Sequence, residues 1–204
     1  GHEGVGRVAA LGPGVEGWSP GARAGAAWLH DTCGACDECG DGHESFCQAQ
    51  RAHGFDVPGT FAEYVAVKAD FAVRLPNEGD PVPLAPLMCA GVTAFGAIRR
   101  ARVGQGETCA IFGCGGLGLY AVQLAVREGA RVVAVDRDDN KLRLAAALGA
   151  ERTVLVHPGA AEPWTEPDRA HSCINFAPTP ATWAAMVAAV RPRGRIVAAA
   201  MVRE

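Results

Sequence analysis

A glycine-rich turn at residues 113–118 constrains what this chain can fold into more than any other segment. Gly113, Gly115 and Gly118 fit the pattern G-x-G-x-x-G, directly after an apolar run at 109–112 and before a segment with helical spacing. In such a strand–turn–helix unit the first glycine allows a tight turn, the second lets the backbone approach a pyrophosphate, and the third permits close helix packing. The candidate cofactor-binding residues of the turn are Gly113, Gly115, Gly116, Leu117 and Gly118.

The apolar pattern beyond about residue 105 supports this interpretation. Short apolar runs alternate with helical segments, which is typical of parallel strands joined by crossover helices. We expect strands near 109–112, 131–135, 153–156, 172–176 and 195–200, and a loop or broken helix at 157–171. The fold class predicted for this part is a Rossmann-type, doubly wound parallel α/β sheet.

Asp136 comes at the end of the second predicted strand, close to the spacing of about 20 residues at which a carboxylate accepts the ribose hydroxyls of adenosine. A carboxylate there also repels a 2′-phosphate, so it favours NAD over NADP. The adjacent Arg137 leaves NADP open, because a guanidinium could accommodate the extra phosphate. The structural alternative is that Asp136 merely caps a helix starting near Asp138.

Four cysteines form the second strong signal. Cys33, Cys36, Cys39 and Cys47 have the spacing C-x2-C-x2-C-x7-C, which can close a tetrahedral thiolate shell around zinc. A redox C-x-x-C motif and a pair of disulfides are the alternatives. The glycines of this segment favour an irregular metal loop, and a closed four-thiolate site is structural rather than catalytic.

Composition narrows the class of protein further. The 204 residues are 49% hydrophobic and 20% charged, with a net charge of −3, so the chain can bury a core and carries no basic footprint for nucleic acid. No uncharged apolar run approaches the length of a membrane span. We expect a cytoplasmic protein that acts on small molecules, and a fragment of a longer chain, because the sequence starts at Gly1 without an initiator Met.

Residues 1 to about 90 are rich in glycine and proline, with short β-type runs at 6–11, 23–29 and 61–67. They predict a β-rich domain into which the cysteine loop is inserted. We place this domain at 1–92, with the zinc loop at 33–47, and the nucleotide-binding domain at 93–204. Three further cysteines, Cys109, Cys114 and Cys173, are expected to be buried as small apolar residues.

Several motifs together resemble the zinc-dependent medium-chain alcohol dehydrogenases. They are GHEGVG at 1–6, the cysteine loop, GTFAEY at 59–64, APLMCAGVT at 85–93 and the segment 112–119. The resemblance implies a truncated GroES-like catalytic domain before a truncated Rossmann domain. It also implies that His2 and Cys89 are ligands of a catalytic zinc, with Glu3 beside the metal or exchanging with a ligand.

The same resemblance assigns three looser roles. Trp28 would line the substrate pocket, Lys141 would reach the adenosine ribose, and Phe176 would lie along the nicotinamide. The ordinary alternative for Trp28 is packing, and for Lys141 it is a solvated position on a helix. The cofactors implied are NAD and two zinc ions, one catalytic and one structural, in a homodimer or homotetramer.

The activity implied is oxidation of a primary or secondary alcohol to an aldehyde or ketone by hydride transfer to NAD. A polyol, threonine or formaldehyde dehydrogenase is possible within the same fold, and so is a zinc-stabilised nucleotide-binding protein without catalysis. The family takes a further catalytic thiolate from a segment upstream of His2, so the 204-residue chain alone is expected to be inactive. Neither nucleic acid nor a membrane is expected as a partner.

Overall fold

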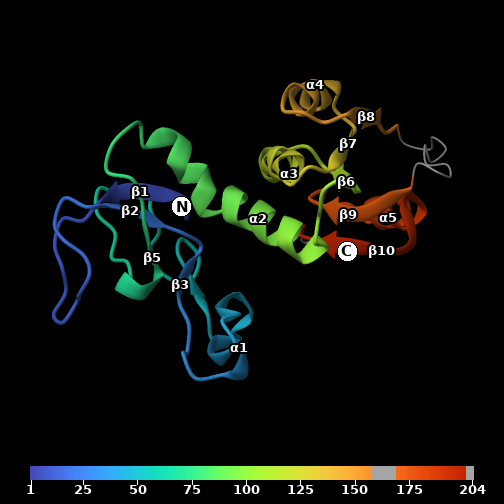
Figure 1. The fold of residues 1–204 in the computed structure, drawn as a ribbon. Coiled ribbons are helices and arrows are strands. Elements are labelled where there is room, and N and C mark those ends of the chain that lie inside the picture. The colour runs from blue at the N-terminus through green and yellow to red at the C-terminus, as the bar shows by residue number, and fades with distance from the viewer. Residues whose placement is uncertain (158–168, 201–204) are drawn as a thin grey trace. The chain divides into compact units, whose positions relative to one another are not determined.

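The computed structural model describes residues 1–157 and 169–200 of the chain (Figure 1). The chain divides into two compact units, Gly1–Cys89 and Ala90–Glu204. Each unit is described by itself. The predicted loop at 157–171 lies largely outside the described residues.

The first unit is built on short antiparallel strands. Its three-stranded sheet has the order β1-β2-β5, and a second pair, β3-β4, carries the cysteine loop between its strands. The strands are β1 (Gly4–Arg7), β2 (Arg23–Ala26), β3 (Leu29–Asp31), β4 (Arg51–Ala52) and β5 (Ala72–Arg74). The helical segments are α1 (Asp37–Gly40) and the 3-10 turns Glu44–Phe46, Ala69–Phe71 and Val82–Met88.

All three strands predicted here need correction. The run at 61–67 is not a strand: it pairs with none of the described strands, and Phe61 is 95% exposed. Alternation alone does not supply a hydrogen-bonded neighbour. The run at 23–29 is two strands, β2 and β3, separated by Ala27 and Trp28. The run at 6–11 keeps only its start, because β1 ends at Arg7.

The second unit is a five-stranded parallel sheet with helices on both faces. Its strand order is β10-β9-β6-β7-β8. The strands are β6 (Thr108–Phe112), β7 (Arg131–Asp136), β8 (Arg152–Leu155), β9 (Ala170–Asn175) and β10 (Val190–Ala198). The helices are α2 (Ala90–Ala101), α3 (Gly116–Arg127), α4 (Asp139–Ala147) and α5 (Ala181–Ala189).

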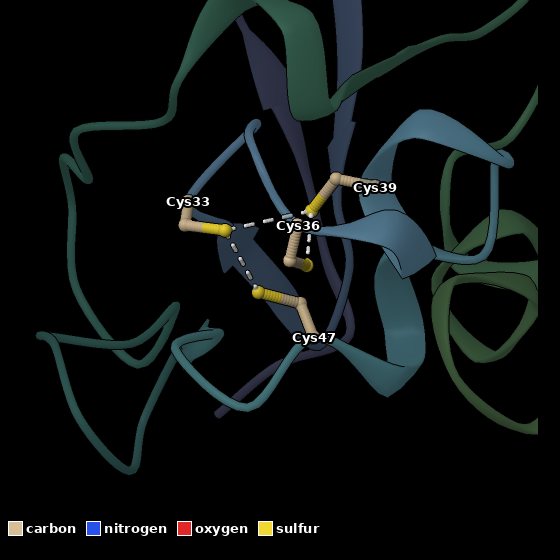
Figure 2. Close-up of side chains that lie close together, drawn as sticks. All are labelled: Cys33, Cys36, Cys39 and Cys47. Carbon is tan, nitrogen blue, oxygen red and sulfur yellow. Dashed lines mark hydrogen bonds between the residues drawn. The ribbon is translucent and has the colours of Figure 1, made fainter.

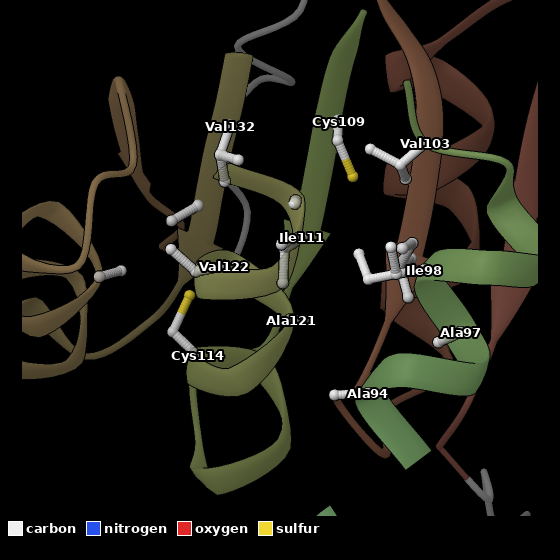
Figure 3. Packing of buried hydrophobic residues seen from close by; sticks show 14 of the residues in the cluster. Ala94, Ala97, Ile98, Val103, Cys109, Ile111, Cys114, Ala121, Val122 and Val132 are labelled. Carbon is white, nitrogen blue, oxygen red and sulfur yellow. The ribbon is translucent and has the colours of Figure 1, made fainter. Parts of the chain in front are cut away.

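Alternating side chains of the strands feed two apolar cores. Cys109 and Ile111 of β6 pack with side chains of α2, α3 and α4 on one face, as Figure 3 shows for part of this cluster. Ala110 and Phe112 pack against α5 on the other face. A sheet covered on both faces explains why its strands appear in the sequence as continuous apolar runs. Cys109, Cys114 and Cys173 are fully buried, as expected.

The strand order reverses beside β6, and this reversal positions the nucleotide turn. The chain runs from β6 through β7 to β8 on one side, then crosses to β9 and β10 on the other. In doubly wound sheets, ligands bind outside the carboxyl ends of the strands at such a switch point. The doubly wound fold class predicted from the sequence is confirmed.

Among the described residues, no single helix is long and apolar enough to cross a membrane. Only the bent pair Val82–Met88 and Ala90–Ala101, taken together, meets the length and hydropathy test for a span.

Candidate metal centre and nucleotide turn

The sulfur atoms of the cysteine loop point toward one another (Figure 2). Sγ of Cys33 lies 3.9 Å from that of Cys39 and 3.6 Å from that of Cys47, and the sulfurs of Cys36 and Cys39 are 3.5 Å apart. All four lie within 4.8 Å of one another, and none forms a disulfide. A tetrahedron with zinc–sulfur bonds of about 2.3 Å has edges of about 3.8 Å. The loop therefore fits a zinc ion without rearrangement of its ligands.

Hydrogen bonds favour thiolates at part of this cluster. The backbone N–H groups of Ala35 and Cys36 lower the pKa of the Cys33 thiol to about 6. The Thr32 side chain lowers the pKa of Cys39. At Cys36 the backbone N–H of Cys39 favours the thiolate, but the neighbouring sulfurs of Cys39 and Cys33 outweigh it and raise the pKa to about 12. A cation replacing the shared protons would stabilise all four as thiolates.

An ion pair that sequence reasoning missed closes the base of the loop. Nε of Arg51 donates to Oδ1 of Asp31 at 2.8 Å, and Nη2 donates to Oδ2, so the pair is bidentate. Asp31 and Arg51 are also paired residues of β3 and β4. The two ends of the cysteine loop are thus held together by both backbone and side chains. The signal in the sequence is an Asp and an Arg placed just outside the first and last cysteines.

The glycine turn has the geometry that its motif predicts. Gly113 adopts a φ of +91°, and a Cβ there would lie 2.8 Å from the backbone nitrogen of Ala177. A Cβ on Gly118 would lie 1.8 Å from the carbonyl oxygen of Gly113. Gly115 and Gly116 have no atom within 4 Å of an added Cβ, so open space lies beside the start of α3.

The N-terminus of α3 is available to an anion. Its N-cap is Gly115, a residue with no side chain to cap the first N–H groups of the helix. Leu117 lies in the first turn of this helix. Unpaired N–H groups beside an open space are what a pyrophosphate requires.

Asp136 makes two hydrogen bonds that connect it to the turn. Its Oδ2 accepts the backbone N–H of Cys114 at 2.7 Å, and its Oδ1 accepts that of Asp138 at 3.0 Å. The cap of α4 is Asp138 itself, whose side chain accepts the N–H of Asn140. Asp136 is therefore not the cap of this helix.

Near Asp136, Arg137 is exposed and Lys141 is half-buried in the first turn of α4.

Phe176 follows β9 directly beside the turn. Its N–H donates to the carbonyl of Phe112 at 2.8 Å. The preceding Asn175 is fully buried; its Oδ1 accepts the N–H of Ala177, while its Nδ2 has no hydrogen-bond partner among the described residues. A buried N–H group without a partner beside the turn fits a site that takes a polar ligand.

The residues proposed for an open metal site all lie in the first unit. The His2 ring meets the Trp28 ring edge-on, with 4.9 Å between centroids. Partial burial raises the pKa of the Cys89 thiol, and the negative charge of Glu3 adds to that rise. Over residues 1–157 and 169–200, however, only the cysteine loop gathers three or more metal ligands within reach of one ion.

A groove of about 790 Å³ also lies in the first unit. Residues of β1, β2 and the segment 60–67 line it, together with Glu3. His2, Trp28 and Cys89 are not among its lining residues.

Two family models match the chain. Residues 1–77 match the alcohol dehydrogenase GroES-like domain, and residues 116–204 match the zinc-binding dehydrogenase domain. An alcohol dehydrogenase of Geobacillus stearothermophilus is 44% identical over 164 residues, which are 80% of this chain and 49% of that protein. The chain spans about half the length of the curated relatives it matches.

Solved structures give the same picture. Galactitol-1-phosphate dehydrogenase from Escherichia coli superposes with a TM-score of 0.91 at 28% identity, covering 100% of this chain and 60% of that one. A Sinorhizobium meliloti 1021 protein assigned to the zinc-binding dehydrogenases, solved with NADP bound, has a TM-score of 0.88 at 32% identity over 98% of this chain and 60% of that one.

Proposed function

Since the chain belongs to the zinc-dependent medium-chain alcohol dehydrogenase family, we propose that the protein oxidises a primary or secondary alcohol by hydride transfer to NAD. The observation that carries the proposal is the presence of two sites in one chain. One is a cysteine loop whose four sulfurs could hold a metal ion, and the other is a glycine turn with the geometry of a dinucleotide-binding motif. The substrate would be a small alcohol or aldehyde, and the assembly a homodimer or homotetramer.

The cysteine loop would hold a structural zinc. Its four sulfurs leave no position for a substrate, so its contribution is to the folding of the first unit. The sulfur–sulfur distances of 3.5–3.9 Å support this role.

The glycine turn would bind the dinucleotide. The pyrophosphate would lie in the open space at Gly115 and Gly116, against the N–H groups at the start of α3. Asp136 would accept the ribose hydroxyls with the lone pairs that Cys114 and Asp138 leave free, and this carboxylate supports NAD. Because a structural relative binds NADP, Arg137 and Lys141 could serve a 2′-phosphate, and NADP belongs in every assay.

His2 and Cys89, with Glu3 beside them, would hold the catalytic zinc. An imidazole and a thiolate are a donor set that suits this ion. A zinc ion held there would supply polarisation of the alcohol oxygen, and a bound nicotinamide would supply the hydride acceptor. The chain's own residues would orient these groups: Trp28 beside His2 would shape the alcohol pocket, and Phe176 would support the nicotinamide.

The test is turnover by the complete gene product. Primary alcohols, secondary alcohols, a sugar alcohol, threonine and formaldehyde would each be assayed with NAD and with NADP. We expect oxidation of at least one alcohol with NAD. His2→Gln and Cys89→Ser should each lower kcat/KM by about a hundredfold or more, since several kcal/mol of charge stabilisation depend on the ion. His157→Gln, at an exposed histidine, is the matched control. Full activity in the His2 and Cys89 variants would refute the assignment.

One observation favours a second candidate. Within the described part of the chain only the closed cysteine site is assembled, which suits a zinc-stabilised nucleotide-binding protein without catalysis. Such a protein would bind the dinucleotide, carry one zinc ion and turn over no alcohol.

A further inference from the structure

Two histidines that the proposed function does not use, His30 and His53, lie close to the backbone of Trp28. His53 is fully buried, and its ring meets that of His30 edge-on, with 4.6 Å between centroids. Nδ1 of His30 lies 2.9 Å from Nε2 of His53. Neither ring belongs to the cysteine loop or to the nucleotide turn.

The carbonyl group of Ala27 fixes the position of one ring proton of His53. Nδ1 lies 2.9 Å from the carbonyl oxygen of Ala27, which can only accept, so Nδ1 carries the proton. A neutral ring then has a lone pair on Nε2, and Nδ1–H of His30 donates to it. If His53 is charged, its Nε2–H can instead donate to Nδ1 of a neutral His30. Both arrangements keep the bond between the rings and the proton on Nδ1 of His53.

His53 also fixes the backbone between β2 and β3, where no strand pairing holds the chain. Ala27 and Trp28 separate β2 from β3, so no strand ladder pairs them. The backbone N–H of His53 donates to the carbonyl of Trp28 at 2.9 Å, and its side chain donates to that of Ala27. Two successive carbonyls are thus held by one buried residue. These bonds fix the backbone that carries the Trp28 side chain. The Trp28 ring meets the His2 ring edge-on, and its centroid lies 6.0 Å from that of the Phe55 ring.

We propose that His53, locked by His30, is a positioning residue that holds Trp28 against His2 and thereby sets which alcohols fit. The proposal rests on the proposed function in that Trp28 is taken as a wall of the substrate pocket. The position of Trp28 itself can be measured without any turnover, which separates the two.

The first test uses the complete gene product labelled with fluorotryptophan, with the Trp28 resonance assigned from Trp28→Phe. His53→Ala should shift or broaden that resonance. His53→Asn places an amide N–H where Nδ1–H lies, and should largely retain it. A Trp28 resonance unchanged in His53→Ala would overturn the proposal.

The second test is the substrate panel. His53→Ala should change the ratio of kcat/KM for bulky over small alcohols by about tenfold, the size of effect expected for a reshaped pocket wall. Adding His53→Ala to Trp28→Ala should change the ratio no further, because His53 acts through Trp28. Additive effects of the two changes would contradict this.

If His53→Ala fails to fold, the ring nitrogens of the unaltered protein decide. With 15N-labelled histidine, Nδ1 of His53 should carry a proton; a ring protonated on Nε2 alone would overturn the proposal. Absence of turnover in every variant, with the expected Trp28 signals, would reject the alcohol dehydrogenase assignment and leave the positioning role standing.

Discussion

Asp136 is the residue on which the proposed choice of cofactor depends. Its two oxygens already accept the N–H groups of Cys114 and Asp138, so the carboxylate orients the glycine turn in addition to its proposed contact with the ribose. A change at this residue should therefore affect both the affinity for the dinucleotide and the discrimination between its two forms.

We predict that Asp136→Ala binds NAD about tenfold or more weakly, since a hydrogen bond to a charged group contributes about 1.5–3 kcal/mol. Discrimination against NADP should fall at the same time, because the repelling charge is gone. The measurement is the Kd of each dinucleotide by titration. Asp138→Ala is the control, an equal loss of charge two residues away that removes only a helix cap worth about 1 kcal/mol. An unchanged NAD-to-NADP ratio in Asp136→Ala would show that the carboxylate does not act on the ribose.

Substitutions at two glycines of the turn should have different effects, one on the stability of the fold and the other on dinucleotide affinity. Gly118→Ala would place a methyl group 1.8 Å from the Gly113 carbonyl oxygen, so we predict a loss of about 3 kcal/mol or more in the free energy of unfolding. Gly115→Ala points into open space with an ordinary φ of −78°, so the fold should persist while dinucleotide affinity drops. Urea unfolding and dinucleotide titration of both variants check this. Equal stability of the two would contradict the packing argument.

At the scale of the elements, the cysteine loop has little other than a metal to hold it. Its α1 helix has four residues and no buried side chain, and of the four ligands only Cys47 is buried. The Asp31–Arg51 pair closes the base but lies outside the loop.

We predict that Cys47→Ser loses one zinc ion per chain and becomes sensitive to proteases between residues 33 and 47. The second unit should keep its dinucleotide affinity, because its core shares no residue with the loop. Cys173→Ala, at a buried cysteine of β9, is the control and should keep all its zinc. Retention of the ion by Cys47→Ser would exclude the four-thiolate site.

The parallel sheet and the cysteine loop could be predicted from sequence because their signals are local. An apolar run buried on both faces and a short cysteine spacing each depend on neighbours along the chain. The first unit was harder to predict, since the run at 61–67 alternates like a strand and yet lacks a partner among the described strands. The contact of His53 with Ala27 gave no such signal, because the two residues lie 26 positions apart in sequence. For Asp31 and Arg51, 20 positions apart, the only hint is their place just outside the first and last cysteines of the loop.

At the scale of the whole molecule, the chain divides its chemistry between two units. The proposed metal ligands lie in Gly1–Cys89, and the glycine turn proposed for the dinucleotide lies in Ala90–Glu204. The proposed reaction needs both, because the metal would polarise the alcohol and the dinucleotide would take the hydride. A binding protein needs only the closed metal site and the turn.

The zinc content of the purified complete gene product tests this account most directly. We predict two zinc ions per polypeptide, one lost in Cys47→Ser and the other in a variant that combines His2→Gln with Cys89→Ser. A single ion per polypeptide, unaffected by the changes at His2 and Cys89, would contradict an open metal site and leave a nucleotide-binding protein with a structural zinc.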